Sequence, residues 1–113
     1  MKVIDVYKQY FEAEGVFSGV PRKGASVVLT ATSGDGEISY EISVSFFPHR
    51  DETDFSISYD AFFTRGIYRA KGRRSKKREA ELMKSLTETA NALAAENGAL
   101  IFWDKPLIEA RFG

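Results

Sequence analysis

The sequence predicts an α+β fold: a mainly antiparallel sheet of about five strands, with one long helix packed on one face and a short N-terminal helix. Three observations predict it. Apolar and polar residues alternate in the middle of the chain, a helical apolar stripe follows, and 43% hydrophobic residues accompany zero net charge. Alternation indicates half-buried antiparallel strands whose apolar face needs a covering layer. The expected order along the single domain, residues 1–113, is α-β-β-β-α-β-β.

Apolar residues near the N-terminus recur at helical spacing, and Gly15 supplies a helix stop. This pattern predicts a helix over residues 2–14. Two glycines and a proline then predict a loop over residues 16–24. The apolar positions of the predicted helix are Val3, Val6, Tyr7 and Tyr10, flanked by Ile4 and Phe11.

Three strands follow, over residues 27–32, 38–46 and 55–63. The first two are joined by a tight hairpin turn, either Gly34-Asp35 in a type II′ turn or Asp35-Gly36 in a type I′ turn. Either turn places the same residues on one face of the sheet. They are Val27, Leu29 and Ala31 with Ile38, Tyr40 and Ile42.

The covering helix is predicted over residues 75–97, with Ser75 as its N-cap and Asn97-Gly98 as its C-terminal stop. Two closing strands, 99–103 and 107–112, are expected around a turn at 104–106. The helical stripe consists of Leu82, Met83, Leu86, Ala90, Leu93 and Ala94.

Charge is neutral in sum and polarised along the chain. Residues 35–60 hold seven acids and one arginine, whereas residues 65–78 hold eight bases and no acid. We call residues 65–78 the basic segment. It predicts a surface for an acidic protein partner or another anion. The candidate contact residues are Arg65, Arg69, Arg73, Arg74, Lys76, Lys77 and Arg78, with Tyr68 and Phe62 for apolar contact.

Two alternatives compete for the basic segment. It could be a solvated surface whose charge is met by acids of its own sheet or of a second subunit. It could also bind nucleic acid, with the aromatic residues stacking on bases, although a pI near 6.6 counts against that class.

The polar face of the predicted sheet is lined by serines and interrupted by Phe62. Small side chains there would let a second copy approach closely, which predicts a homodimer, while a solvated face is the alternative. If Phe46 lies opposite Phe55, Glu41 lies opposite Asp60, and a two-residue shift instead pairs Ser43 with Asp60. The pair Glu41 and Asp60 is the weaker, catalytic candidate.

Other catalytic chemistry finds little support in the residues. There is no cysteine, the one histidine, His49, lies in a polar loop, and no metal-ligand, P-loop or dinucleotide spacing is present. We therefore expect a non-catalytic binding protein with no cofactor and no metal. The alternative is a small enzyme that uses the acidic pair or His49, or a ligand-binding protein, with a pocket beside the sheet. No signal peptide or apolar run of membrane-spanning length is visible, so the expected location is the cytoplasm.

Overall fold

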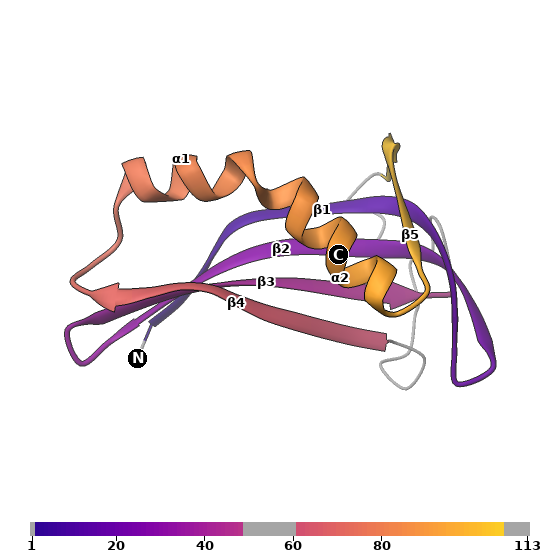
Figure 1. The fold of residues 1–113 in the computed structure, drawn as a ribbon, viewed down its shortest axis with the longest axis horizontal. Helices are drawn as coiled ribbons and strands as arrows, with labels where there is room; N and C mark the ends of the chain where they lie inside the picture. The colour runs from indigo at the N-terminus through magenta and orange to yellow at the C-terminus, as the bar shows by residue number, and fades with distance from the viewer. Residues whose placement is uncertain (1, 49–60, 108–113) are drawn as a thin grey trace.

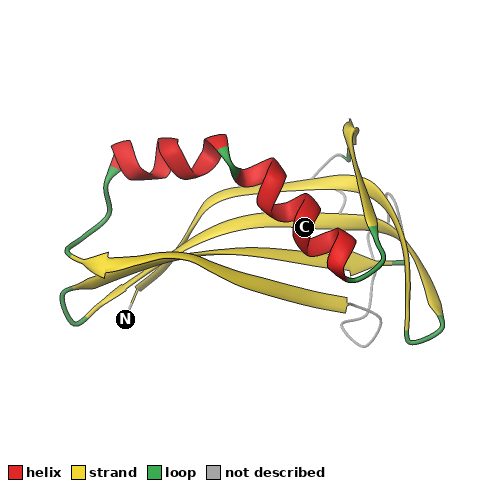
Figure 2. Cartoon of the chain, viewed as in Figure 1, coloured by secondary structure: helices red, strands yellow, loops and turns green. Residues whose placement is uncertain are grey.

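The computed structural model describes residues 2–48 and 61–107 and consists of one five-stranded antiparallel sheet with two helices (Figures 1 and 2). The strand order is β4-β3-β2-β1-β5. The predicted antiparallel sheet is confirmed, but the predicted order of elements is wrong, because the chain begins with four strands. The elements are β1 (Lys2–Phe17), β2 (Val20–Gly34), β3 (Glu37–Phe47), β4 (Ala61–Lys71), α1 (Lys76–Lys84), α2 (Leu86–Glu96) and β5 (Leu100–Pro106).

The predicted N-terminal helix over 2–14 is wrong, because these residues belong to strand β1. Two register shifts interrupt β1, between Asp5 and Tyr7 and between Glu12 and Gly15. A bulge adds a residue and so changes the spacing of side chains that share a face. The first shift therefore puts two inward residues three positions apart, as on a helix, whereas the inward positions between the two shifts recur every two residues. Several inward residues lie opposite buried residues of β2. They are Ile4 opposite Ala31, Tyr7 opposite Leu29 and Phe11 opposite Ala25.

The predicted loop over 16–24 is also wrong. β1 and β2 continue to a two-residue turn, Ser18-Gly19, in which both residues have positive φ. Gly15 lies where β5 approaches β1, and an added Cβ would lie 3.0 Å from the Cβ of Ala99. This close approach explains a glycine inside the strand.

The turn of the β2–β3 hairpin is Asp35-Gly36, one of the two turns that the sequence predicts. Both turn residues have positive φ, 54° and 73°, as a type I′ turn requires, and Gly34 pairs with Glu37. The alternative frame, Gly34-Asp35, is wrong. The shared face is confirmed, since all six residues predicted for it are buried: Val27, Leu29, Ala31, Ile38, Tyr40 and Ile42.

Strand β4 runs from Ala61 to Lys71, further along the chain than predicted, and residues 55–60 lie outside the described part. The predicted register is wrong, because Phe46 lies opposite Ala61. A register shift between Tyr40 and Glu41 leaves Ile67 as an extra residue in β4. This bulge interrupts the alternation through residues 64–71 and hides the strand from pattern analysis.

The single long helix is wrong, because the chain forms α1 and α2 with Ser85 between them. The Ser85 hydroxyl and backbone N–H both donate to the carbonyl of Leu82, at 3.2 Å each. Such a local hydrogen bond competes with the helical ladder and bends a helix. The predicted N-cap is confirmed, since the Ser75 hydroxyl accepts from the N–H of Arg78, and α2 ends at Asn97.

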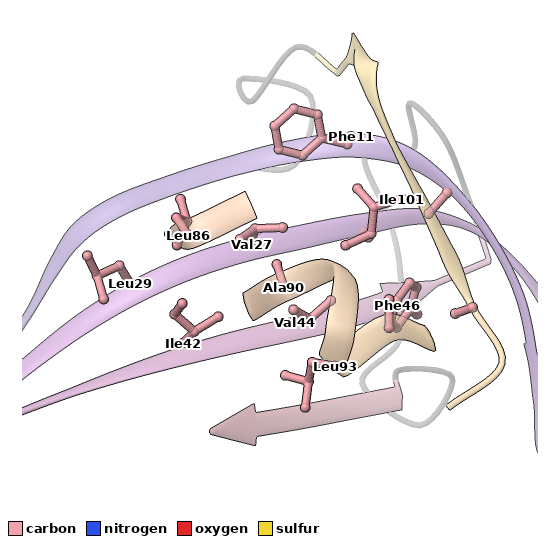
Figure 3. Packing of buried hydrophobic residues seen from close by; sticks show 14 of the residues in the cluster. Phe11, Val27, Leu29, Ile42, Val44, Phe46, Leu86, Ala90, Leu93 and Ile101 are labelled. Carbon is pink, nitrogen blue, oxygen red and sulfur yellow. The ribbon is translucent and has the colours of Figure 1, made fainter. Parts of the chain in front are cut away.

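The core lies between the sheet and α2 (Figure 3). We call the face of the sheet covered by α2 the helix side and the opposite face the outer face. Leu86, Ala90 and Leu93 of α2 pack against apolar side chains of β2 and β3. β5 adds Ile101 and crosses β1 at residues Phe11–Glu14. The predicted turn at 104–106 is wrong because β5 continues to Pro106, and residues 108–112 of the second closing strand lie outside the described part.

Two adjacent valines test this assignment of faces. Val27 is fully buried on the helix side, whereas Val28 lies half-buried on the outer face. We expect Val27→Ala to lower the free energy of unfolding by about 2 kcal/mol, and Val28→Ala to lower it by less than half as much. Urea unfolding followed by circular dichroism measures both. Equal losses would contradict the assignment.

Candidate partner-binding surface

Four of the eight bases in the basic segment are paired with carboxylates of the same chain. Arg69 lies 2.9 Å from Glu37, Arg78 lies 3.1 Å from Glu81, and Arg65 pairs with Glu96 at the end of α2. Arg74 makes the fourth pair, with Glu79. The structure therefore agrees in part with the alternative in which acids of the same molecule neutralise the segment.

The other four bases remain without such partners. Lys71, Arg73, Lys76 and Lys77 are exposed, and no carboxylate among the described residues forms an ion pair with them. All four lie where β4 ends and α1 begins, at the left end of Figure 1. We call these four residues the free cations.

A cleft of about 240 Å³ opens beside the free cations. Lys71 and Arg73 line it together with Ser75, Arg78 and the ring of Tyr68. The Arg78 guanidinium lies over the Tyr68 ring, 4.3 Å from its centroid. The cleft therefore combines two free cations with an aromatic wall, which suits a carboxylate or another oxyanion carried on a larger partner.

A buried network anchors the start of α1 to the sheet. The Tyr40 hydroxyl donates to Glu79 Oε2 at 2.6 Å, and Arg74 donates to both carboxylate oxygens at 2.8 and 2.9 Å. The hydrogen bond from Arg74 lowers the pKa of Glu79 below its ordinary value, and burial raises the pKa of Tyr40. Because Tyr40 belongs to β3, this network holds the free cations in a defined place relative to the sheet.

The two aromatic candidates lie on opposite faces. Tyr68 lies opposite Tyr40 and faces the helix side, whereas Phe62 lies opposite Ser45 and faces the outer side. Phe62 is 62% exposed. They do not form one stacking surface, so the structure does not bring together the aromatic platform that the nucleic-acid alternative uses.

The outer face carries two shallow hollows. One, of about 420 Å³, contains Phe62, Val3 and Val28 among serines and threonines. The other, of about 570 Å³, lies beside the β4 bulge and contains Glu37, Glu41 and Arg69. The serine-lined face that the sequence predicts is thus present, with Ser43 and Ser45 in the first hollow.

The structure does not bring the catalytic candidates together as predicted. Glu41 lies opposite Gly66, not Asp60, and Ser43 lies opposite Thr64, so both predicted pairings are wrong. Asp60 and His49 lie outside the described residues. Within residues 2–48 and 61–107, no group of three His, Asp or Glu side chains could hold a metal ion.

Several residues of this surface escaped the sequence analysis. Glu79 is buried although the predicted helix places it among bases, and nothing in the sequence indicates its contact with Tyr40, 39 residues away. Only the Arg78–Glu81 pair could have been read from spacing, since i and i+3 meet on a helix.

Arg22 was also missed. It is 4% exposed and donates to three backbone carbonyls, those of Phe17, Val20 and Phe46, at 3.2 to 3.3 Å. These bonds tie the β1–β2 hairpin to the end of β3. Arg22 therefore has a structural role away from the free cations.

No family model, curated protein or solved structure matches this chain. Among the described residues, neither helix has the length and apolar character needed to cross a membrane.

The buried network makes stability depend on pH. The pKa of Glu79 is lowered in the folded state. The contribution of Glu79 to the free energy of unfolding is therefore complete above the unfolded pKa near 4.5 and is lost as pH falls through the folded pKa. We expect Glu79→Gln to lower the free energy of unfolding by about 1–3 kcal/mol at neutral pH. The difference from wild type should shrink below about pH 4.

Glu81→Gln is the matched control, since Glu81 lies two residues away in an exposed pair with Arg78. We expect it to change stability by less than about 0.5 kcal/mol. Urea unfolding across a pH series measures both variants. Equal effects, or a Glu79→Gln effect that does not vary with pH, would show that the network does not anchor α1.

Proposed function

We propose that the protein is a non-catalytic binding protein that engages an acidic segment of a protein partner through the free cations. The observation that carries this proposal is the division of the basic segment. Four bases are used in ion pairs within the chain, and four are exposed together at one end of the molecule. Exposed bases of one sign attract and orient an oppositely charged partner.

Local energetics does not account for this arrangement. Lys76 and Lys77 lie in the first turn of α1, where the helix dipole disfavours positive charge by a few tenths of a kcal/mol each. Lys71 and Arg73 add repulsion without a compensating carboxylate among the described residues. A cluster that costs stability and is held in place by a buried network is well suited to binding.

Nucleic acid is the less favoured partner. The chain has no net positive charge, and Phe62 and Tyr68 lie on opposite faces. Dedicated nucleic-acid modules combine a basic excess with aromatic residues that share one surface.

Neutralising the free cations tests the proposal. The variant Lys71→Gln, Arg73→Gln, Lys76→Gln, Lys77→Gln should bind a fluorescein-labelled polyglutamate peptide at least about tenfold more weakly than wild type, because charge complementarity at close range is lost. Fluorescence anisotropy at low ionic strength measures the dissociation constants. Wild-type binding should weaken as salt is added.

The matched control carries Lys2→Gln, Lys23→Gln, Lys84→Gln and Lys105→Gln, which changes net charge equally at exposed residues outside the basic segment. It should bind within about twofold of wild type. Equal losses of peptide affinity in both variants would show that binding depends on net charge alone and would contradict a specific site. A labelled oligodeoxythymidine that binds wild type more tightly than polyglutamate does would favour the nucleic-acid alternative.

We also propose that two copies pair through the outer face. Val3 and Phe62 are 61% and 62% exposed there, and the surrounding Ser and Thr side chains are small enough for close approach. Asp5 and Lys8 line the same hollow. In the proposed dimer a twofold axis through this hollow would bring Asp5 of one copy toward Lys8 of the other and make the surface complementary to itself.

A single substitution tests this assembly. Phe62→Glu places two like charges in the interface, so we expect a dimeric wild type and a monomeric variant in sedimentation equilibrium at micromolar concentration. Val16→Glu is the control, because Val16 is 64% exposed at the β1–β2 hairpin. It should remain dimeric. A monomeric wild type, or a dimeric Phe62→Glu variant, would contradict the proposed dimer.

A further inference from the structure

β4 is an edge strand of the sheet. It pairs with β3 on one side, and no strand within residues 2–48 and 61–107 pairs with its other side. Its 11 residues end at Lys71, the first of the free cations. An unpaired edge presents backbone N–H and C=O groups that can accept a further strand.

The composition of β4 decides which strand it could accept. The strand carries Arg65, Arg69 and Lys71 and no acid. A second β4 would bring two cationic strands together, and the bulge at Ile67 further disfavours regular pairing of an edge with itself. An acidic strand is favoured instead, because its carboxylates complement Lys71 and the other free cations, which follow β4 in the chain.

We propose that β4 accepts an extended acidic segment as a sixth strand of the sheet, ending beside Lys71 and Arg73. This inference rests on the proposed function and specifies how the acidic partner binds. Backbone hydrogen bonds would supply affinity along the edge, and the alternating side chains would supply specificity.

The two faces of β4 impose a pattern on the added segment. On the outer face Glu41 lies opposite Gly66. Because Gly66 has no side chain to cover the Glu41 carboxylate, an acidic residue of the added segment beside Gly66 would meet a like charge. Arg65 and Arg78 on the helix side and Arg69 on the outer face are already paired with carboxylates of the chain. The unpaired bases nearest to β4 are Lys71 and Arg73, which line the cleft at its end. The added segment therefore carries an uncharged residue beside Gly66 and carboxylates at its end, beside Lys71 and Arg73.

The probe is a synthetic peptide of alternating valine and glutamate. In a strand, each residue directs its N–H and C=O to the same side, and successive residues alternate sides. Methylating the backbone nitrogen of every valine, or of every glutamate, therefore blocks only one edge of the peptide while keeping its charge. We expect one methylated peptide to bind at least about tenfold more weakly than the parent and the other to bind almost as well as the parent.

Hydrogen exchange locates the bound peptide on the wild-type protein. Amides of β4 should exchange at least about tenfold more slowly with the parent peptide than without it. Paired substitutions add a positional test. Lys71→Gln with Arg73→Gln should weaken peptide binding more than Lys76→Gln with Lys77→Gln, because the first pair lies at the end of β4 and the second lies within α1.

The outcomes separate this inference from the function on which it rests. Polyglutamate binding that depends on the free cations, with no effect of methylation and no protection of β4, would overturn the edge-strand inference and leave the proposed function standing. Failure of all peptides to bind at up to about 1 mM would overturn both. Slower exchange at residues 2–9 of β1 in place of β4 would show that the peptide binds at another site. Slower exchange of β4 that grows with protein concentration in the absence of peptide would show that a second copy occupies the edge. Either result would overturn the inference.

Discussion

The period of two in β2 and β3 is the constraint on which the rest of the structure depends. Alternation gathers the buried apolar side chains from Val27 to Ala31 and from Ile38 to Phe46 on one face, and the sheet is stable only when that face is covered. α2 provides the cover with Leu86, Ala90 and Leu93. α2 lies on the helix side, and the preceding helix α1 begins near the end of β4. The chain therefore turns back over the sheet between β4 and α1, and the free cations lie together at that end of the molecule.

The ion pairs of the basic segment differ in what they do. Three of them, at Arg65, Arg69 and Arg78, join exposed or half-exposed side chains, and such pairs contribute little stability. The pair of Arg74 with Glu79 is different, because the carboxylate is buried and also accepts from Tyr40. Glu79 therefore connects the helix to the sheet, and the unpaired bases on either side of Arg74 remain available.

The elements that the sequence predicted correctly are those with uninterrupted periodicity. The β2–β3 hairpin has no register shift, so its turn and its buried face could be read from the residues alone. β1 has two shifts and β4 has one, and each bulge turns a spacing of two into a spacing that resembles a helix or no pattern. The β-branched and aromatic residues of β1, among them Val3, Ile4 and Tyr7, favour a strand and are the local signal for it.

The candidate surface could be predicted only in part, for a related reason. The run of bases is a local property, and its sequence position was visible, but the partners of Arg65 and Arg69 are 31 and 32 residues distant along the chain. Whether a base is neutralised depends on strand register and on where α2 ends, and neither follows from the run itself. The basic segment thus contains bases with a structural role and bases that are exposed and unpaired. Arg74 pairs with Glu79 and secures α1, whereas its neighbour Arg73 faces solvent, and this difference is visible only in the folded chain. The bases that folding leaves unpaired, Lys71, Arg73, Lys76 and Lys77, are the ones that can attract a partner.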